Sequence, residues 1–188
     1  RIAIVSEVAR QRAGKGDADA TRPLATIAAA ARELVDTMGD IVWAVDPKQD
    51  SYADLVQRMR DFAEELCASA AIELRFSAAY DHATTTLDAR LRRQAFLVFK
   101  ESVNNAVKHS QCAVIKTRVQ IAGGRLSVTV VDDGKGIDDV RRRDGHGLTN
   151  LKLRAAELHG TCEIAAEAGR GTKVEFHAPL RPAARRRT

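Results

Sequence analysis

The hydrophobic pattern of this chain changes from a helical period to strict alternation near residue 71, and this change limits the folds available to it. Before residue 71, apolar residues recur every three or four positions, as on one face of a helix. After it, alternating runs flank glycine turns and are separated by helical segments. We therefore expect an α+β chain with a helical segment over 1–70 and a sheet-containing domain over 71–180.

The helical segment is expected to hold two helices with a polar, glycine-containing break over 14–21. Apolar residues in the second helix step by four and three positions: Leu24, Ala28, Ala31, Val35, Met38, Val42 and Val45. A flanking series, Ile27, Leu34 and Ile41, widens this stripe. A stripe of this width suits a four-helix bundle, which two helices can form only as a dimer of hairpins. We predict a homodimer; an intramolecular helical core is the alternative.

The remaining elements follow from caps, alternation and turns. Ser51-Tyr-Ala-Asp54 resembles a capping box that opens a third helix ending near Ser69. The elements expected next are a strand over 72–76, a helix over 88–110, a hairpin over 113–130, a helix over 148–159 and a hairpin over 162–178. Strands with one polar and one apolar face predict an α/β sandwich, with a mixed sheet covered by helices on one face.

Charge, hydropathy and cysteines exclude several classes of protein. Four arginines in the tail over 181–188 contribute most of the net charge of +5, so a basic, disordered tail is favoured over a nucleic-acid-binding face. No apolar run approaches the ~18 residues of a membrane span. Cys67, Cys112 and Cys162 are widely spaced and form no CxxC pair. They predict reduced thiols in a cytoplasmic protein.

Four polar or glycine-rich segments follow one another in the second half of the chain, at 100–109, 132–136, 145–148 and 169–172. Taken singly, they are compatible with a solvated helix face, an Asp-Gly turn, an exposed basic loop and a hairpin turn. Their order and their separation by strand-like runs favour a different interpretation. They predict one nucleotide pocket assembled from dispersed pieces.

Each segment contains residue types suited to part of such a pocket. Glu101 and Asn105 share a helix face and offer the hard oxygen ligands that Mg²⁺ prefers. Asp132, at a strand end, can accept a hydrogen bond from an exocyclic amine such as that of adenine. Gly145 and Gly147, before a helix, leave free amides that suit phosphate. The arginines at 141–143 could close over a triphosphate as a lid or form an exposed basic loop.

In this order, the segments ESVNNAVKH, DDGKGI, GHGLTNL and GRGT resemble the N, G1, G2 and G3 boxes of the ATP-binding fold shared by sensor histidine kinases, DNA gyrase and MutL-type ATPases. The resemblance covers about residues 70–180 and implies the GHKL, or Bergerat, fold with ATP and Mg²⁺. It implies that Glu101 is catalytic and that Asn105 and Glu101 hold the metal. The cofactor-binding residues it implies are Asn105, Lys108, His109, Asp132, Gly134, Gly136, Gly145, His146, Gly147, Leu148 and Thr172.

The segments over 39–47 and 55–62 are similar to those after the phosphoacceptor hairpin in two-component sensor kinases with a short lid. This resemblance implies transfer of the ATP γ-phosphoryl to a histidine and relay to an aspartate of a response-regulator receiver domain. It implies a homodimeric, cytoplasmic fragment without nucleic-acid or membrane contact; a membrane anchor elsewhere in the protein is left open. Glu101 would orient or deprotonate the attacking imidazole.

One departure from the family concerns the phosphoacceptor. None of the five histidines lies in residues 1–70, and the chain starts at Arg1 rather than Met. We therefore expect a fragment that begins downstream of its acceptor and does not phosphorylate itself. His109 is predicted to contact phosphate or the helix end, with a catalytic base as the alternative. The other functions left open are an ATP-gated conformational ATPase of the gyrase or MutL kind and a non-catalytic dimerisation module.

Overall fold

The computed structural model describes residues 27, 31, 34, 38–40, 42–43, 46–79, 83–136, 146–167 and 171–180. They belong to two compact units, Arg1–Val45 and Asp46–Thr188. The named elements all lie in the second unit. In chain order they are η2 (Pro47–Gln49), α3 (Tyr52–Ser69), β1 (Glu73–Ala78), α4 (Ala89–Asn105), the π-helical turn η3 (Ala106–Ser110), β2 (Val114–Ala122), β3 (Arg125–Asp132), α6 (His146–Ala156), β4 (Thr161–Glu167) and β5 (Gly171–Pro179).

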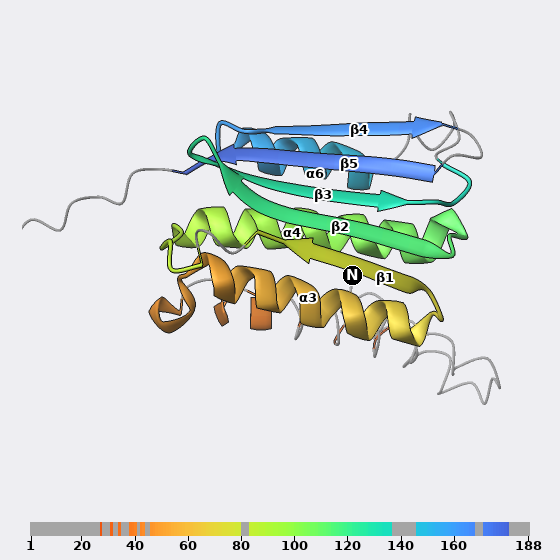
Figure 1. The fold of residues 1–188 in the computed structure, drawn as a ribbon, viewed down its shortest axis with the longest axis horizontal. Coiled ribbons are helices and arrows are strands. Elements are labelled where there is room, and N and C mark those ends of the chain that lie inside the picture. The colour runs from red at the N-terminus through yellow and green to blue at the C-terminus, as the bar shows by residue number, and fades with distance from the viewer. Residues whose placement is uncertain are drawn as a thin grey trace, which may run out of the picture. The chain divides into compact units, whose positions relative to one another are not determined.

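The second unit is built on a five-stranded sheet with the order β1-β2-β3-β5-β4 (Figure 1). β1 pairs with β2 in parallel, and the other neighbours are antiparallel. A parallel pair needs a crossover connection, and α4 supplies it between β1 and β2. The mixed sheet predicted from the alternation is therefore confirmed.

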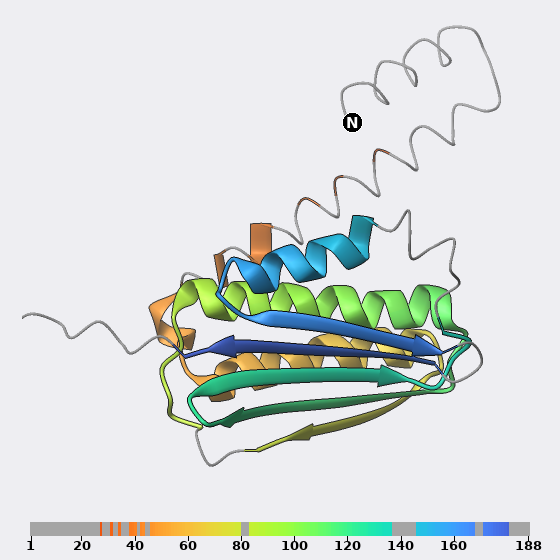
Figure 2. The same ribbon diagram turned by 90° about the horizontal axis from the view of Figure 1, so that it is seen from above.

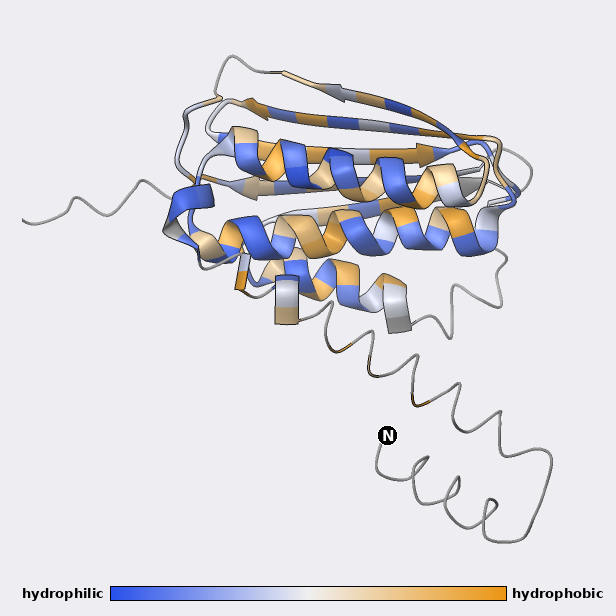
Figure 3. Ribbon diagram, turned by 90° about the horizontal axis from the view of Figure 1, so that it is seen from below, coloured by the Kyte–Doolittle hydropathy of each residue, from blue (hydrophilic) through white to orange (hydrophobic). Residues whose placement is uncertain are grey.

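Both predicted hairpins are present. β2 and β3 pair from Ile115↔Asp132 to Ala122↔Arg125 and turn at Gly123-Gly124, where both glycines have positive φ, +56° and +71°. β4 and β5 pair from Thr161↔His177 to Glu167↔Gly171. In Figure 3 the strands change between orange and blue along their length, as expected for a sheet with one apolar and one polar face.

Among the described residues, α3, α4 and α6 cover the apolar face of the sheet. α4 contacts both α3 and α6, so it occupies the middle of the helical layer (Figure 2). The largest fully buried side chains come from both layers: Tyr52, Leu55 and Met59 on α3, Val98, Phe99 and Val103 on α4, Leu151 on α6, and Ile115, Val119, Leu126 and Phe176 on the strands. This packing confirms the predicted sandwich with helices on one side.

The helix starts follow from their capping residues. Ser51 Oγ accepts a hydrogen bond from Asp54 N–H at 3.2 Å, and the Asp54 carboxylate accepts one from Ser51 N–H at 3.1 Å, so the predicted capping box is confirmed. Asp88 caps α4 in the same manner by accepting from Arg90 N–H at 2.9 Å. These caps fix where the helices begin relative to the strands.

The unit that contains the sheet begins at Asp46, earlier than the boundary expected near residue 70. α3 packs on this unit: Leu55 and Met59 are fully buried, and the buried Tyr52 hydroxyl donates to the Val119 carbonyl on β2 at 2.9 Å. Helical periodicity in the sequence shows that α3 has an apolar face, but it does not show what that face covers. The third helix is thus part of the sheet-containing unit.

The first unit is described at a few positions, all of them helical. Leu34, Met38 and Val42 recur every four residues there and are 53%, 65% and 66% exposed. They form part of the apolar stripe predicted for this helix. Among the described residues, no helix combines the length and the hydropathy that crossing a membrane requires.

Candidate functional site

The last turns of α4 present the two residues predicted to hold a metal. Glu101 and Asn105 are one turn apart and half-buried. The Asn105 side-chain amide donates a hydrogen bond to Glu101 Oε1 at 3.1 Å. The carboxylate and the amide oxygen are thereby held together on one helix face, as the spacing predicted.

The second glycine of the Gly145-His-Gly147 segment lies directly against this pair. A Cβ atom on Gly147 would stand 2.8 Å from Glu101 Oε1 and 3.8 Å from Asn105 Nδ2. Gly147 belongs to the first turn of α6, where free backbone amides and the helix dipole favour an anion. The absence of a side chain on Gly147 therefore lets the Glu101 carboxylate lie close to the N-terminus of α6.

Asp132 lies at the end of β3 and is 5% exposed. Its Oδ1 accepts a hydrogen bond from Gly134 N–H at 3.0 Å. Burial raises the pKa of the Asp132 carboxyl, while hydrogen bonds from the Gly134 backbone and from Thr172 lower it in part. A buried acceptor at a strand end suits recognition of an amine group, the role predicted for Asp132.

The Asp132–Gly136 loop contacts Ser110, the last residue of η3, which directly follows α4. A Cβ on Gly134 would stand 2.3 Å from the Ser110 carbonyl oxygen, which accepts a hydrogen bond from Lys135 N–H at 2.9 Å. The Ser110 hydroxyl donates to the Ala106 carbonyl at 2.6 Å and so spans the π-helical turn. These contacts therefore connect the helical segment that carries Glu101 to the loop that carries Asp132.

Gly171 brings the fourth segment to Asp132. It has φ +83°, and a Cβ there would stand 1.9 Å from the Asp132 carbonyl oxygen. Only glycine accepts both that conformation and that approach. The next residue, Thr172, interacts with the Asp132 carboxyl through its backbone and its hydroxyl.

Asp133, the neighbour of Asp132, has a structural role. Its Oδ1 accepts hydrogen bonds from Ala113 N–H and Val114 N–H, both at 2.9 Å. These hydrogen bonds lower the pKa of the Asp133 carboxyl, that from Val114 most. Asp133 therefore secures the start of β2, while Asp132 faces the buried side of the strand end.

The other predicted residues are placed as follows. Lys108 and His109 lie on η3, just beyond Asn105, with exposed side chains. Gly136 has φ +77°, a backbone conformation that favours glycine, and Leu148 is half-buried in the first turn of α6. The segment over 137–145, with Gly145 and the arginines at 141–143, lies outside the described residues, as does the His146 side chain.

The donor set fits a magnesium ion that keeps most of its water ligands. One carboxylate and one amide oxygen are available at Glu101 and Asn105, and Mg²⁺ is commonly held by one or two protein oxygens together with substrate phosphates. Among the described residues, no group of three or more His, Cys, Asp or Glu side chains gathers into a cage of protein ligands.

Two residues of this site were not among the predicted ones. Gly171 is part of the GRGT segment, and the Gly-x-Gly pair was a signal for it, but the sequence does not reveal its contact with Asp132. Ser110 directly follows Lys108 and His109, yet a serine at a helix end has many roles. Its contact with Gly134 joins residues that are 24 positions apart, and local sequence patterns do not reveal such a contact.

Comparisons with known proteins agree with this geometry. The family described as histidine kinase-, DNA gyrase B-, and HSP90-like ATPase matches residues 91–182. Sensor histidine kinase LiaS of Bacillus subtilis is 28% identical over 104 residues, which are 55% of this chain and 29% of the relative. The signal transduction histidine-protein kinase/phosphatase UhpB of Salmonella typhimurium is 28% identical over 153 residues, 79% of this chain and 29% of the relative.

A solved histidine kinase domain, from the blue-light activated histidine kinase EL346 of Erythrobacter litoralis, has a similar fold. Its TM-score is 0.61 at 19% identity, with 94% of each chain covered. Thus the chain spans less than a third of the two curated relatives and nearly all of this solved domain. Residues 91–182 thus match the histidine kinase-, DNA gyrase B- and HSP90-like ATPase family, and the sheet with its helical layer has the fold of a histidine kinase catalytic domain.

Proposed function

We propose that this domain binds ATP between Asp132 at one end and the Glu101–Gly147 contact at the other. The observation that carries the proposal is the convergence of three glycines, Gly134, Gly147 and Gly171, on one helix and one buried aspartate. Side chains at these positions would fill the space or displace the backbone. The Asp132 carboxylate would accept a hydrogen bond from the adenine amine, and the amides at the N-terminus of α6 would donate to phosphate oxygens.

We propose that Asn105 and Glu101 hold Mg²⁺ at the phosphate end. The ion would neutralise charge on the phosphate oxygens when bound. Lys108 and His109, exposed on η3 beyond Asn105, would add positive charge or hydrogen-bond donors beside the triphosphate. Thr172 would support the base end through its interaction with Asp132.

The reaction proposed is transfer of the γ-phosphoryl group to the imidazole of a histidine on a dimerisation helix. Such a transfer depends mainly on positioning and on charge stabilisation. Glu101, whose carboxylate lies beside Gly147, would orient the attacking imidazole or accept its proton. Residues 1–70 contain no histidine, so the acceptor would lie outside them.

The partners proposed are a second copy of the chain and a response-regulator receiver domain. The exposed apolar residues Leu34, Met38 and Val42 support the first, because an apolar stripe on one helix favours packing against another. The second follows from the kinase resemblance: a receiver aspartate would take the phosphoryl group from the phosphohistidine.

Nucleotide binding is tested by titration calorimetry with Mg-ATP. The variant Asp132→Asn should bind at least about tenfold more weakly, the value of one charge-assisted hydrogen bond of roughly 1.5–3 kcal/mol. The neighbouring variant Asp133→Asn is the matched control, since it keeps an acceptor for Ala113 and Val114 and should bind as the wild type does. Equal affinities in all three proteins would contradict the role of Asp132.

Phosphotransfer is tested with γ-labelled ATP. The chain should label a separately supplied dimerisation helix that contains an acceptor histidine, but not itself. Stoichiometric phosphohistidine on the chain itself would contradict the proposed location of the acceptor. Steady-state ATP hydrolysis with ATP-dependent dimerisation, and no labelled histidine, would indicate an ATP-gated conformational module instead.

A further inference from the structure

α4 and α6 run antiparallel, and they meet at two points with the same spacing on both helices. At one point Gly147 lies against Glu101, and at the other Arg154 bonds Gln94. Glu101 lies seven residues after Gln94, and Arg154 lies seven residues after Gly147. At about 1.5 Å per residue, both separations are roughly 10.5 Å, or two turns. The same faces of the two helices therefore meet at both points.

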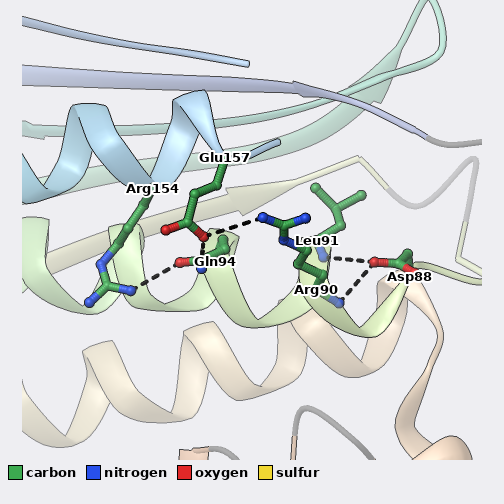
Figure 4. A network of polar contacts seen from close by, with 6 residues as sticks. All are labelled: Asp88, Arg90, Leu91, Gln94, Arg154 and Glu157. Carbon is green, nitrogen blue, oxygen red and sulfur yellow. Dashed lines mark hydrogen bonds and ion pairs between the residues drawn. The ribbon is translucent and has the colours of Figure 1, made fainter. Parts of the chain in front are cut away.

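The contact far from the nucleotide site is a polar clamp formed by Gln94, Arg154 and Glu157 (Figure 4). The Gln94 Nε2 donates to Glu157 Oε2 at 2.6 Å, and its Oε1 accepts from Arg154 Nη1 at 3.0 Å. Gln94 is 5% exposed, whereas Arg154 and Glu157 reach solvent. The two ends of the amide are chemically different, so one orientation alone satisfies both partners.

The clamp supplies directional contacts, which the apolar part of the interface between α4 and α6 lacks. Val98 on α4 and Leu151 on α6 are buried, and in sequence they lie between the two points where the helices meet. Apolar burial is non-directional and changes little when a helix slides along its axis, whereas hydrogen bonds lose strength with small changes of distance and angle. The clamp therefore adds a directional constraint on the position of α6 along its axis, and with it on the distance from Gly147 to Glu101.

We propose that Gln94 is a positioning residue for the nucleotide site, because through Arg154 and Glu157 it sets where the N-terminus of α6 stands relative to Glu101. This inference rests on the proposed function, in which that N-terminus binds phosphate. The described contacts of Asp132 include those with Gly134 and Gly171, which lie outside α6. A loosened clamp should therefore weaken binding of the phosphates and spare binding of adenosine.

The experiment exchanges donor and acceptor across the clamp. Gln94→Glu retains an acceptor for Arg154 but sets two carboxylates against each other. The double variant Gln94→Glu with Glu157→Gln restores complementarity, because the introduced amide can donate to the introduced carboxylate. Glu65→Gln, at an exposed position on α3, is the matched control for loss of one carboxylate. Hydrogen exchange over residues 147–151 is measured without nucleotide, and affinities for Mg-ATP and adenosine are measured by calorimetry.

For Gln94→Glu we expect faster hydrogen exchange over residues 147–151 and unchanged affinity for adenosine. The affinity for Mg-ATP should fall about tenfold, as it does when residues that support a binding site are removed. The double variant should recover wild-type values. The proposal is overturned if exchange is unchanged, if the double variant does not recover, or if adenosine binding falls in proportion.

A second variant keeps the test decisive if Gln94→Glu does not fold. Arg154→Ala removes the other half of the clamp from a partly exposed position and should give the same pattern of exchange and affinities. If the wild type does not bind Mg-ATP, the proposed function fails. Exchange over 147–151 then decides the role of the clamp independently, because it is measured without nucleotide.

Discussion

Replacement of Gly171 by alanine should be the most damaging single-methyl substitution at the site. Gly171 starts β5 with φ +83°, and its Cα lies so close to β3 that a Cβ would stand 1.9 Å from the Asp132 carbonyl oxygen. Carbon–oxygen contacts normally lie at about 3.3 Å or more. The overlap therefore exceeds about 1 Å, and it falls on backbone that pairs Val131 with Lys173 in the sheet.

The free energy of unfolding should fall by two contributions. A non-glycine residue in the left-handed region costs roughly 1–2 kcal/mol, and forcing a methyl group into a packed site costs about 1–3 kcal/mol more. Gly171→Ala should therefore destabilise the domain by about 2–5 kcal/mol, a large part of the ~5–15 kcal/mol typical of a folded domain. Any relaxation that relieves the overlap moves Asp132, so Mg-ATP affinity should fall as well.

The matched control is Gly124→Ala. Gly124 has φ +71°, close to that of Gly171, but a Cβ there would meet nothing within 4 Å. The control should lose only the conformational contribution of about 1–2 kcal/mol and keep wild-type affinity for Mg-ATP. Urea unfolding followed by circular dichroism gives both free energies. Equal destabilisation by the two variants would refute the close approach of Gly171 to Asp132.

Three further predictions concern other parts of the molecule. Burial raises the pKa of the Asp132 carboxyl, so this group contributes stability that is present below its unfolded pKa and is lost as the pH rises through its folded pKa. Asp132→Asn should therefore become more stable relative to the wild type as the pH rises through that window, which urea unfolding at several pH values would show. The same variant should lose affinity for Mg-ATP. Burial raises the pKa of the Cys162 thiol to about 11, so a thiol reagent near neutral pH should label Cys162 only after unfolding, as mass spectrometry would show. Met38→Glu places a charge on the exposed apolar stripe and should shift the chain from dimer to monomer in sedimentation experiments, whereas an unchanged dimer would remove the stripe from the interface.

Much of the fold is predictable because local chemistry specifies it. The Ser51–Asp54 capping box, the Gly123-Gly124 turn and the alternation along β2 and β3 each act within a few residues, and each is confirmed. The assignment of α3 to the sheet-containing unit was not predictable in this way. Its apolar face is visible in the sequence, but the Val119 carbonyl that receives the Tyr52 hydroxyl lies 67 residues away.

Local sequence patterns were enough to identify the residue types of the candidate site and the elements that carry them. Glu101 and Asn105 had to share a helix face because the helical repeat places residues four apart together, and Asp132 had to end a strand because alternation runs up to it. Their mutual arrangement was decided by the tertiary structure. Gly147 meets Glu101, Gly171 meets Asp132, and Gln94 clamps α6 only after the sheet and its helical layer have packed. The physical reason is the separation of the residues along the sequence. Periodicity and helix caps depend on residues close together in the chain, whereas these contacts join distant segments that only packing brings together.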